Sequence, residues 1–300
     1  MKSATRLLNQ HLVPALTVLS ENTYLSAIRA GMVSVVPLTI IGGLFIIVAF
    51  LPVTGWDKVV APYLQLLQVP VTATFGLLSV FACFAIAYDL GKQLRQEAIV
   101  SATIATVVFL MIQLKLGAKP DDIAFAMDGL GSKGLFTAVV IALVSVRVQK
   151  FFADKNLVIK LPENVPAVVY ESFLSLSPLF FLVLVFWVIR FVLGVDIDHL
   201  VQTAFQPLVF ALNTLPGILV YAFLVTLLWS VGINGDNAMD AIVAPIFLQY
   251  LTANVEAMTA GQPLPYVTAY GFFTAFVNVG GTGATIALAL VMLNSREPGY

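Results

Sequence analysis

Seven long apolar runs dominate this chain of 300 residues. A transmembrane helix needs about 20 consecutive, mostly apolar residues, and runs of that length are unusual in water-soluble domains. The runs cover residues 31–51, 73–90, 98–116, 134–150, 172–194, 206–230 and 270–293. They predict an all-α integral membrane protein, a polytopic helical bundle of about seven spans. A further apolar piece, 241–251, is too short to span and predicts a re-entrant or interfacial segment.

Composition supports this class and excludes others. Only 10% of the residues are charged, whereas a soluble domain carries about 25%. The apolar runs are continuous, unlike the alternating strands of a membrane β-barrel. A formal net charge of −1 offers no polyanion-binding surface, so nucleic acid is not an expected partner. The single cysteine, Cys83, cannot form an internal disulfide or a cysteine-based metal site, and its apolar setting predicts a buried or lipid-facing thiol.

Basic residues in the connecting segments predict the orientation, because Lys and Arg are enriched on the cytoplasmic side. An N-terminus inside the cell places nine of them in the cytoplasm and five outside. Residues 1–30 then form an amphipathic cytoplasmic segment before the first span. The inner set is Lys2, Arg6, Arg29, Lys92, Arg95, Arg147, Lys150, Lys155 and Lys160, and the outer set is Lys58, Lys115, Lys119, Lys133 and Arg190.

A polar stretch interrupts the apolar pattern in "LLWSVGINGDNAMDAIVAPI". Glycine loosens a helix, and non-helical backbone at membrane depth persists only where protein or water satisfies it. A sugar suits such a place, because each hydroxyl both donates and accepts hydrogen bonds. We predict a sugar-facing loop, with an ordinary cytoplasmic turn as the alternative. Trp229 at its edge could stack on a sugar face or anchor at the interface. The predicted site residues here are Gly232, Asn234, Gly235, Asp236 and Asn237.

A second polar set lies in "FVNVGGTGATIALAL", residues 276–290. Asn278, Gly281 and Thr282 are its predicted sugar-binding members. Small residues at this density line a thin-walled, hydrogen-bonding cavity, or alternatively allow two helices to approach closely.

Other motifs carry little chemistry. "GLGSKG", residues 129–134, matches a nucleotide-binding glycine pattern but opens an apolar run, so we interpret it as a turn and helix start. His199 lies with Asp196 and Asp198 in "GVDIDHLVQ", which we interpret as a solvated outer loop. We expect no catalytic residue, no metal and no cofactor.

The chain resembles the membrane component, enzyme IIC, of the lactose/cellobiose/diacetylchitobiose family of the bacterial phosphotransferase system. The first-span block "YLSAIRAGMVSVVPLTIIGGLFIIVAFLP" is similar to that of the family. The most specific match is the I-K-x-P-x-x-V-P core, residues 159–166, in "NLVIKLPENVPAVVYESF". "GINGDN" and "GGTGAT" resemble two later family blocks.

The resemblance implies a dimeric sugar permease in the bacterial inner membrane. Residues 31–200 would form the scaffold and dimerisation spans, and 201–300 a partial substrate-binding part that moves as a rigid body. A disaccharide such as cellobiose, diacetylchitobiose or lactose would be carried inward and phosphorylated by a separate IIB protein that carries phosphocysteine. The phosphoryl chemistry then belongs to that partner. Implied partners are the sugar, phosphorylated IIB, membrane lipid and a second copy of the chain.

Two departures from the family keep other functions open. The family commonly has histidine in G-I-H-G, where this chain has Asn234, and an amide cannot act as a base near neutral pH. The family also continues into an N-E-P segment that this chain does not match, so the family fold is expected to be truncated here. The alternative is a transport-incompetent remnant that acts as a membrane scaffold or sensor. An ion-coupled transporter would require an embedded acidic relay, for which only Asp89 and Asp236 are candidates.

Overall fold

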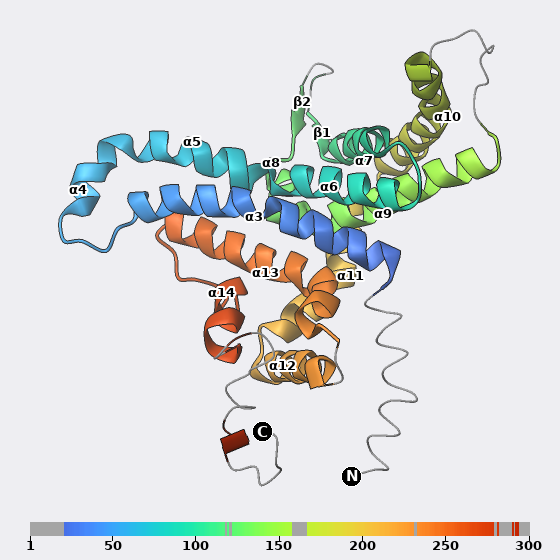
Figure 1. Ribbon diagram of the computed structural model, residues 1–300. Helices are drawn as coiled ribbons and strands as arrows, with labels where there is room; N and C mark the ends of the chain where they lie inside the picture. Colours follow the sequence, from blue (N-terminus) through green and yellow to red (C-terminus); the bar gives the residue numbers. More distant parts are fainter. Residues whose placement is uncertain are drawn as a thin grey trace. The chain divides into compact units, whose positions relative to one another are not determined.

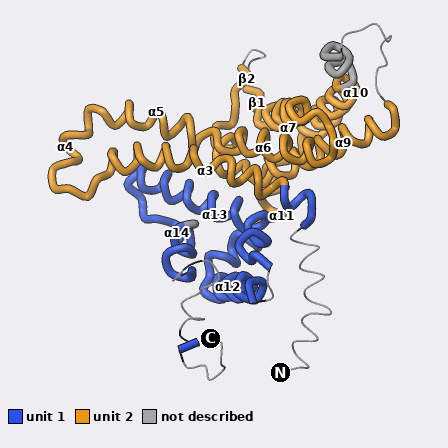
Figure 2. The backbone as a smooth tube through the Cα atoms, viewed as in Figure 1, with its two compact units in different colours: residues 1–26, 206–300 blue, residues 27–205 orange. Residues whose placement is uncertain are grey.

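A computed structural model describes residues 21–117, 119, 122–157, 167–230, 233–278, 281, 290 and 292–293 (Figure 1). The chain divides into two compact units, coloured separately in Figure 2. Unit 2 comprises residues 27–205, and unit 1 comprises residues 1–26 and 206–300. Both units are built almost entirely of helices, which confirms the predicted all-α membrane class.

The elements of unit 2 are mostly long apolar helices. They are α3 (Thr23–Ala49), α4 (Trp56–Val60), α5 (Leu64–Thr74), α6 (Leu78–Gln93), α7 (Ala98–Ile112), β1 (Leu114–Leu116), β2 (Ile123–Phe125), α8 (Met127–Leu130), α9 (Leu135–Asp154) and α10 (Ala167–Trp187), which continues as a π-helical turn, Val188–Val192. The first four residues of α3 belong to unit 1. The predicted cytoplasmic segment 1–30 lies outside the described residues as far as residue 20, and from Thr23 onward it is continuous with α3.

Helix α3 packs antiparallel against α5 and α6 through two glycines. A Cβ at Gly31 would lie 2.2 Å from a side-chain atom of Ile86, and one at Gly42 would lie 2.3 Å from Thr74 Oγ1. Gly31 on α3 thus lies against Ile86 on α6, and Gly42 lies against Thr74 at the end of α5. The later position on α3 meets the earlier position on the partner, so the helices run in opposite directions. The missing side chains allow close helix contact, which is a common packing mode in membranes.

Helices α6, α7 and α9 form the core of unit 2. Ser101 on α7 donates from Oγ to Oε1 of Gln149 on α9 at 2.6 Å, and both side chains are buried. At the other end, Ser79 Oγ donates to the carbonyl of Gly131 just before α9. Cys83 is fully buried in α6, as the apolar setting predicted. Buried polar groups paired across helices in this way fix the packing register.

Between α7 and α9 the chain forms a β-hairpin. The predicted span 98–116 is wrong in its last part, because α7 ends at Ile112 and residues 114–116 form strand β1. Strand β1 pairs antiparallel with β2, with Lys115 opposite Ala124. The Gly-rich segment after the hairpin leads through α8 and a 3₁₀ turn, Ser132–Gly134, into α9, so it opens a helix as predicted.

Unit 1 contains the C-terminal elements. Helix α11 (Ile197–Leu212) enters it from unit 2 at residue 206, and α12 (Leu215–Ser230), α13 (Gly235–Thr259) and α14 (Tyr270–Phe272) follow, the last continuing as a π-helical turn, Phe273–Val277. Helices α11 and α12 are bent by 86° relative to each other. The predicted span 206–230 is therefore not one continuous helix, since Asn213 and Thr214 interrupt it before Pro216.

Helix α13 also differs from the sequence prediction. The piece 241–251 was expected to be too short to span, but it is the middle of a helix of 25 residues. At 1.5 Å per residue that helix is about 37 Å long, enough to cross the hydrocarbon core. The polar residues before position 241 and after 251 are helical, although their polarity is typical of loops.

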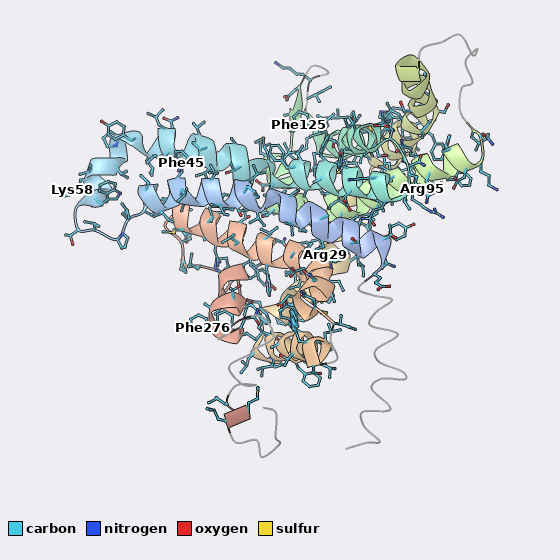
Figure 3. All side chains as sticks on the ribbon, viewed as in Figure 1. Arg29, Phe45, Lys58, Arg95, Phe125 and Phe276 are labelled. Atoms are coloured by element: carbon cyan, nitrogen blue, oxygen red, sulfur yellow. The ribbon has the colours of Figure 1, made fainter. Side chains whose placement is uncertain are left out.

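Among the described residues, five helices are long and apolar enough to span a membrane, or six if α11 and α12 count as one broken span. The seventh predicted run, 270–293, begins with α14 and lies mostly outside the described residues. Figure 3 shows Lys58 and Arg95 at opposite ends of the helices of unit 2.

Candidate functional site

The predicted polar loop is mainly the first turns of α13. Asn234 is the N-cap residue, with extended backbone, and its Oδ1 accepts a hydrogen bond from the Asn237 N–H at 2.9 Å. Asn is among the best N-cap residues because its side chain satisfies an otherwise unpaired helix N–H. An acidic residue in the first turn, Asp236, also complements the helix dipole. The polar residues therefore begin a helix. In the described part of residues 227–246, only Ile233 and Asn234 are non-helical.

Gly235 allows α13 to begin close to α12. A Cβ at this position would lie 2.2 Å from the backbone carbonyl oxygen of Val225. The residue is buried, so a side chain could not turn away into open space. The sequence predicted Gly235 as a sugar contact. The structure gives it a packing role, and a role in binding stays a prediction.

Asp236 joins three segments of unit 1. Its Oδ2 accepts a hydrogen bond from Trp229 Nε1 at the end of α12 at 2.9 Å, and its Oδ1 accepts one from Asn278 Nδ2 at 3.3 Å. Asp236, Trp229 and Asn278 are all half-buried. The two polar sets of the sequence, 42 residues apart at these positions, thus meet at one carboxylate.

The second set is only partly described. Asn278 accepts a hydrogen bond on its backbone carbonyl from the Gly281 N–H at 3.0 Å. Gly281 has a φ of 122°, which favours glycine, and is exposed. Gly232 and Thr282, both predicted site residues, lie outside the described residues.

Aromatic side chains hold the segment that carries Asn278. The ring of Phe273 lies 4.4 Å from that of Tyr221 on α12, and the Tyr221 ring lies 5.7 Å from that of Phe247 on α13. Phe273 and Tyr221 are both buried. Packed aromatic pairs contribute beyond their buried area, so this cluster orients the chain just before Asn278.

The sequence did not predict a second group of polar side chains. These side chains form hydrogen bonds with backbone N–H and C=O groups between the helices of unit 1. Asn254 on α13 donates to the Tyr266 carbonyl at 2.7 Å and accepts from the Tyr266 N–H at 3.0 Å. Thr268, which is buried, donates to the carbonyl of Leu212 at 2.9 Å. Asn213 Oδ1 accepts from the Val267 N–H at 3.3 Å. The only sequence signal was the turn-forming "NTLPG" at 213–217.

A cavity of about 460 Å³ lies among α11, α12 and α13. Leu208, Leu212, Val220, Leu224 and Ile242 are among its lining residues, and Met239 is the lining residue nearest in sequence to Asp236. A sugar loses hydroxyl hydrogen bonds in such an apolar space. The chemistry therefore favours the Asp236 region over this cavity as a sugar site.

The Asp236 region offers a carboxylate, an indole face and amide groups. Charge-assisted hydrogen bonds to a carboxylate are stronger than neutral ones, and an aromatic ring can stack on the apolar face of a sugar ring. Asn234 and Asn237 are exposed on the same helix start. This is the chemistry of a polyhydroxyl binding surface.

Comparisons with known proteins agree with one family. The family model described as "Phosphotransferase system, EIIC" matches residues 29–297. The chain is 34% identical to the putative permease IIC component YwbA of Bacillus subtilis, with 98% of this chain and 70% of the relative covered. It is 33% identical to the cellobiose-specific EIIC component of Geobacillus stearothermophilus, with 96% and 68% covered.

A solved structure agrees in fold. The crystal structure of the transporter ChbC, the IIC component of the N,N′-diacetylchitobiose-specific phosphotransferase system, matches with a TM-score of 0.86 at 32% identity. The match covers 97% of this chain and 72% of that chain. The family model spans most of the chain and the fold agrees over nearly all of it, so this chain belongs to the EIIC family of the phosphotransferase system, whose members are membrane proteins that bind sugar and work with IIB partners.

Proposed function

We propose that this chain is a permease component that binds a β-linked disaccharide and carries it across the membrane for phosphorylation by a IIB protein. The substrate class follows from relatives described as specific for cellobiose, oligo-β-mannoside and N,N′-diacetylchitobiose. The proposed contacts are Gly232, Asn234, Gly235, Asp236, Asn237, Asn278, Gly281 and Thr282.

The observation that carries the proposal is the meeting of Trp229, Asp236 and Asn278. The carboxylate is half-buried and each of its oxygens is engaged by one neutral donor. Each carboxylate oxygen can accept more than one hydrogen bond, so Asp236 retains capacity to accept from a sugar hydroxyl. The Trp229 ring is held by its own N–H at the edge of this group, where its face could lie against a sugar ring.

Sugar binding by the purified chain tests this proposal directly. Isothermal titration in detergent with cellobiose, N,N′-diacetylchitobiose and lactose should give micromolar affinity for at least one sugar, and α-linked maltose is the control. Absence of binding across the β-linked panel would overturn the proposal. Uptake of the bound sugar by proteoliposomes, with phosphorylated IIB present, distinguishes a permease from a scaffold or sensor that binds without transport.

We also propose that the N-terminus is cytoplasmic, that the chain forms a homodimer in the lipid bilayer, and that residues 31–200 are scaffold and 201–300 the moving part. Labelling of single cysteines at Lys58 and Arg95, in a Cys83→Ala background, tests the orientation. A membrane-impermeant reagent should label position 58 from outside and position 95 only after the cells are opened. Labelling of position 95 in intact cells would contradict it.

A further inference from the structure

Unit 2 contains a buried polar cluster that the proposed sugar site does not use. Gln113 follows α7, Thr137 lies in the first turn of α9, and Asp198 lies in the first turn of α11. Gln113 is 1% exposed and Thr137 is fully buried. The segment around Asp198, expected as a solvated loop, is helical from Ile197, so the sequence interpretation is wrong there.

The cluster is short of hydrogen-bond partners. Both amide atoms of Gln113, the Thr137 hydroxyl oxygen and Asp198 Oδ1 are buried without a hydrogen bond to any described residue. Gln113 and Thr137 are close enough to influence the Asp198 carboxylate, yet they do not reach hydrogen-bonding geometry with it. Leaving one such group unsatisfied costs about 1–3 kcal/mol, and more for a charged one. Several together indicate that a bound species completes the cluster.

The oxygen atoms converge on one glycine. A Cβ added to Gly129 would lie 1.9 Å from Gln113 Oε1 and 2.9 Å from Asp198 Oδ2. The absence of a side chain at Gly129 thus lets both oxygens come close to its backbone and to each other. An amide oxygen and a carboxylate oxygen cannot donate to each other, so a donor or a cation that both contact would satisfy them together.

The other charged side chains near Asp198 form ion pairs with one another. Arg190, in the π-helical turn after α10, lies near Asp198 and forms an ion pair with Asp196 at 3.5 Å. His199 follows on α11 and donates its backbone N–H to Asp196. Asp128 and Lys133, on the segment beside Gly129, pair with each other at the surface. One uncompensated carboxylate with two neutral oxygens matches a monovalent ion better than a divalent one, which usually recruits more carboxylates.

We propose that Gln113 Oε1, Thr137 Oγ1 and the Asp198 carboxylate form a site for one monovalent cation, taken up as Na⁺ or as a proton on the carboxylate. Gly129, which has no side chain, allows the Gln113 and Asp198 oxygens to approach each other. An ion bound here stabilises the contact of α11 with α9 and with the segment after α7. The site lies wholly within unit 2 and does not depend on the proposed sugar function.

Thermal unfolding of the purified full chain in detergent tests the site with the ions alone. At about pH 8, NaCl should raise the Tm relative to choline chloride of equal ionic strength, saturably and by about 3–8 °C if Na⁺ is the ligand. If a proton is the ligand, the Tm in choline chloride should fall as the pH rises above about 5, where an aspartate in the unfolded chain has already lost its proton, and should level off once the folded protein has released its own. A proton bound to the folded state stabilises it at low pH, and this stabilisation is lost as the pH rises to the pKa of the carboxyl in the folded protein.

Variants assign the effect to the cluster. Asp198→Asn should abolish whichever dependence the wild type shows. Thr137→Val should raise the Na⁺ concentration at half-saturation at least tenfold, or, if a proton is the ligand, should move the midpoint of the pH dependence by at least one pH unit. Asp196→Asn is the matched control and should keep the dependence. Although partial burial acts in the opposite direction, the His199 N–H and the Arg190 guanidinium hold the pKa of the Asp196 carboxyl below its usual range. Asp196 therefore stays ionised across this titration.

The pH series is measured in a His199→Gln background, so that the imidazole cannot produce the transition. Thr137→Val decides the outcome if Asp198→Asn does not fold, because it leaves the carboxylate in place. A wild-type Tm that is insensitive to both Na⁺ and pH would overturn the site. A dependence that survives unchanged in Asp198→Asn, or in Thr137→Val where Asp198→Asn is unfolded, would also overturn it.

Discussion

The indole Nε1 of Trp229 donates a hydrogen bond to Asp236 Oδ2 at 2.9 Å. This bond ties the end of α12 to the first turn of α13 across the Gly-containing connection. The same carboxylate accepts a second hydrogen bond, from Asn278 Nδ2 in the segment after α14. A change at position 236 therefore affects three segments at once.

Asp236→Asn should weaken sugar binding by about 10- to 100-fold. The substitution preserves shape but replaces one accepting oxygen by an N–H₂ group that faces a donor, and a hydrogen bond to a charged group is worth about 1.5–3 kcal/mol. Isothermal titration with the sugar bound by the wild type measures the change. Asp57→Asn, at an exposed position on α4, is the control and should bind normally. Equal affinities for the two variants would exclude Asp236 from the site.

Asn234 should separate a capping role from a binding role. Asn234→Ala removes the acceptor for the Asn237 N–H and should lower the free energy of unfolding by about 1 kcal/mol, measured as a lower Tm. Asn234→Asp keeps that acceptor and should retain the Tm. If the Asn234 amide also donates to the sugar, Asn234→Asp should still lose affinity. A Tm for Asn234→Ala equal to that of the wild type would contradict the cap.

Gly235→Ala should destabilise unit 1 by about 1–3 kcal/mol, because its Cβ would collide with the Val225 carbonyl oxygen. Thermal unfolding in detergent measures the loss. Gly43→Ala is the matched control, since a Cβ at this helical position meets nothing within 4 Å. Alanine favours a helix interior over glycine, so Gly43→Ala should be neutral or slightly stabilising. Similar Tm losses for both variants would show that close packing at 235 is not the cause.

Thr268→Val should destabilise the corner between α11 and α12. The change keeps the side-chain shape but removes the donor to the Leu212 carbonyl, and leaves that buried group unsatisfied at a cost of about 1–3 kcal/mol. Thr226→Val on α12 is the control, because its hydroxyl is exposed and bonds only to Ala222 in its own helix. Thermal unfolding in detergent, followed as the Tm of each variant, measures the loss. An unchanged Tm for Thr268→Val would count against the corner bond.

The sequence predicted the class of fold well and the helix boundaries less well. Apolar length alone is enough to identify α3, α9 and α10, because each must bury its backbone hydrogen bonds internally in a bilayer. It failed at Asn213 and Thr214, where two apolar pieces meet at a bend of 86°. It failed again in α13, because Asp236 and Asn237 count as loop residues in any hydropathy sum yet are held in helix by the Asn234 cap.

The residue pattern by itself determined that this chain lies in a membrane and that two polar sets interrupt its spans. Those properties depend on composition and spacing, which need no tertiary contact. Only the tertiary structure decided that Asp236 accepts hydrogen bonds from Trp229 and Asn278, that Gly235 packs closely against α12, and that Gln113 and Asp198 meet beside Gly129. Such contacts join different helices and segments of the chain. Their geometry depends on how helices pack, because a side chain's partners are set by the neighbouring helices rather than by its own segment.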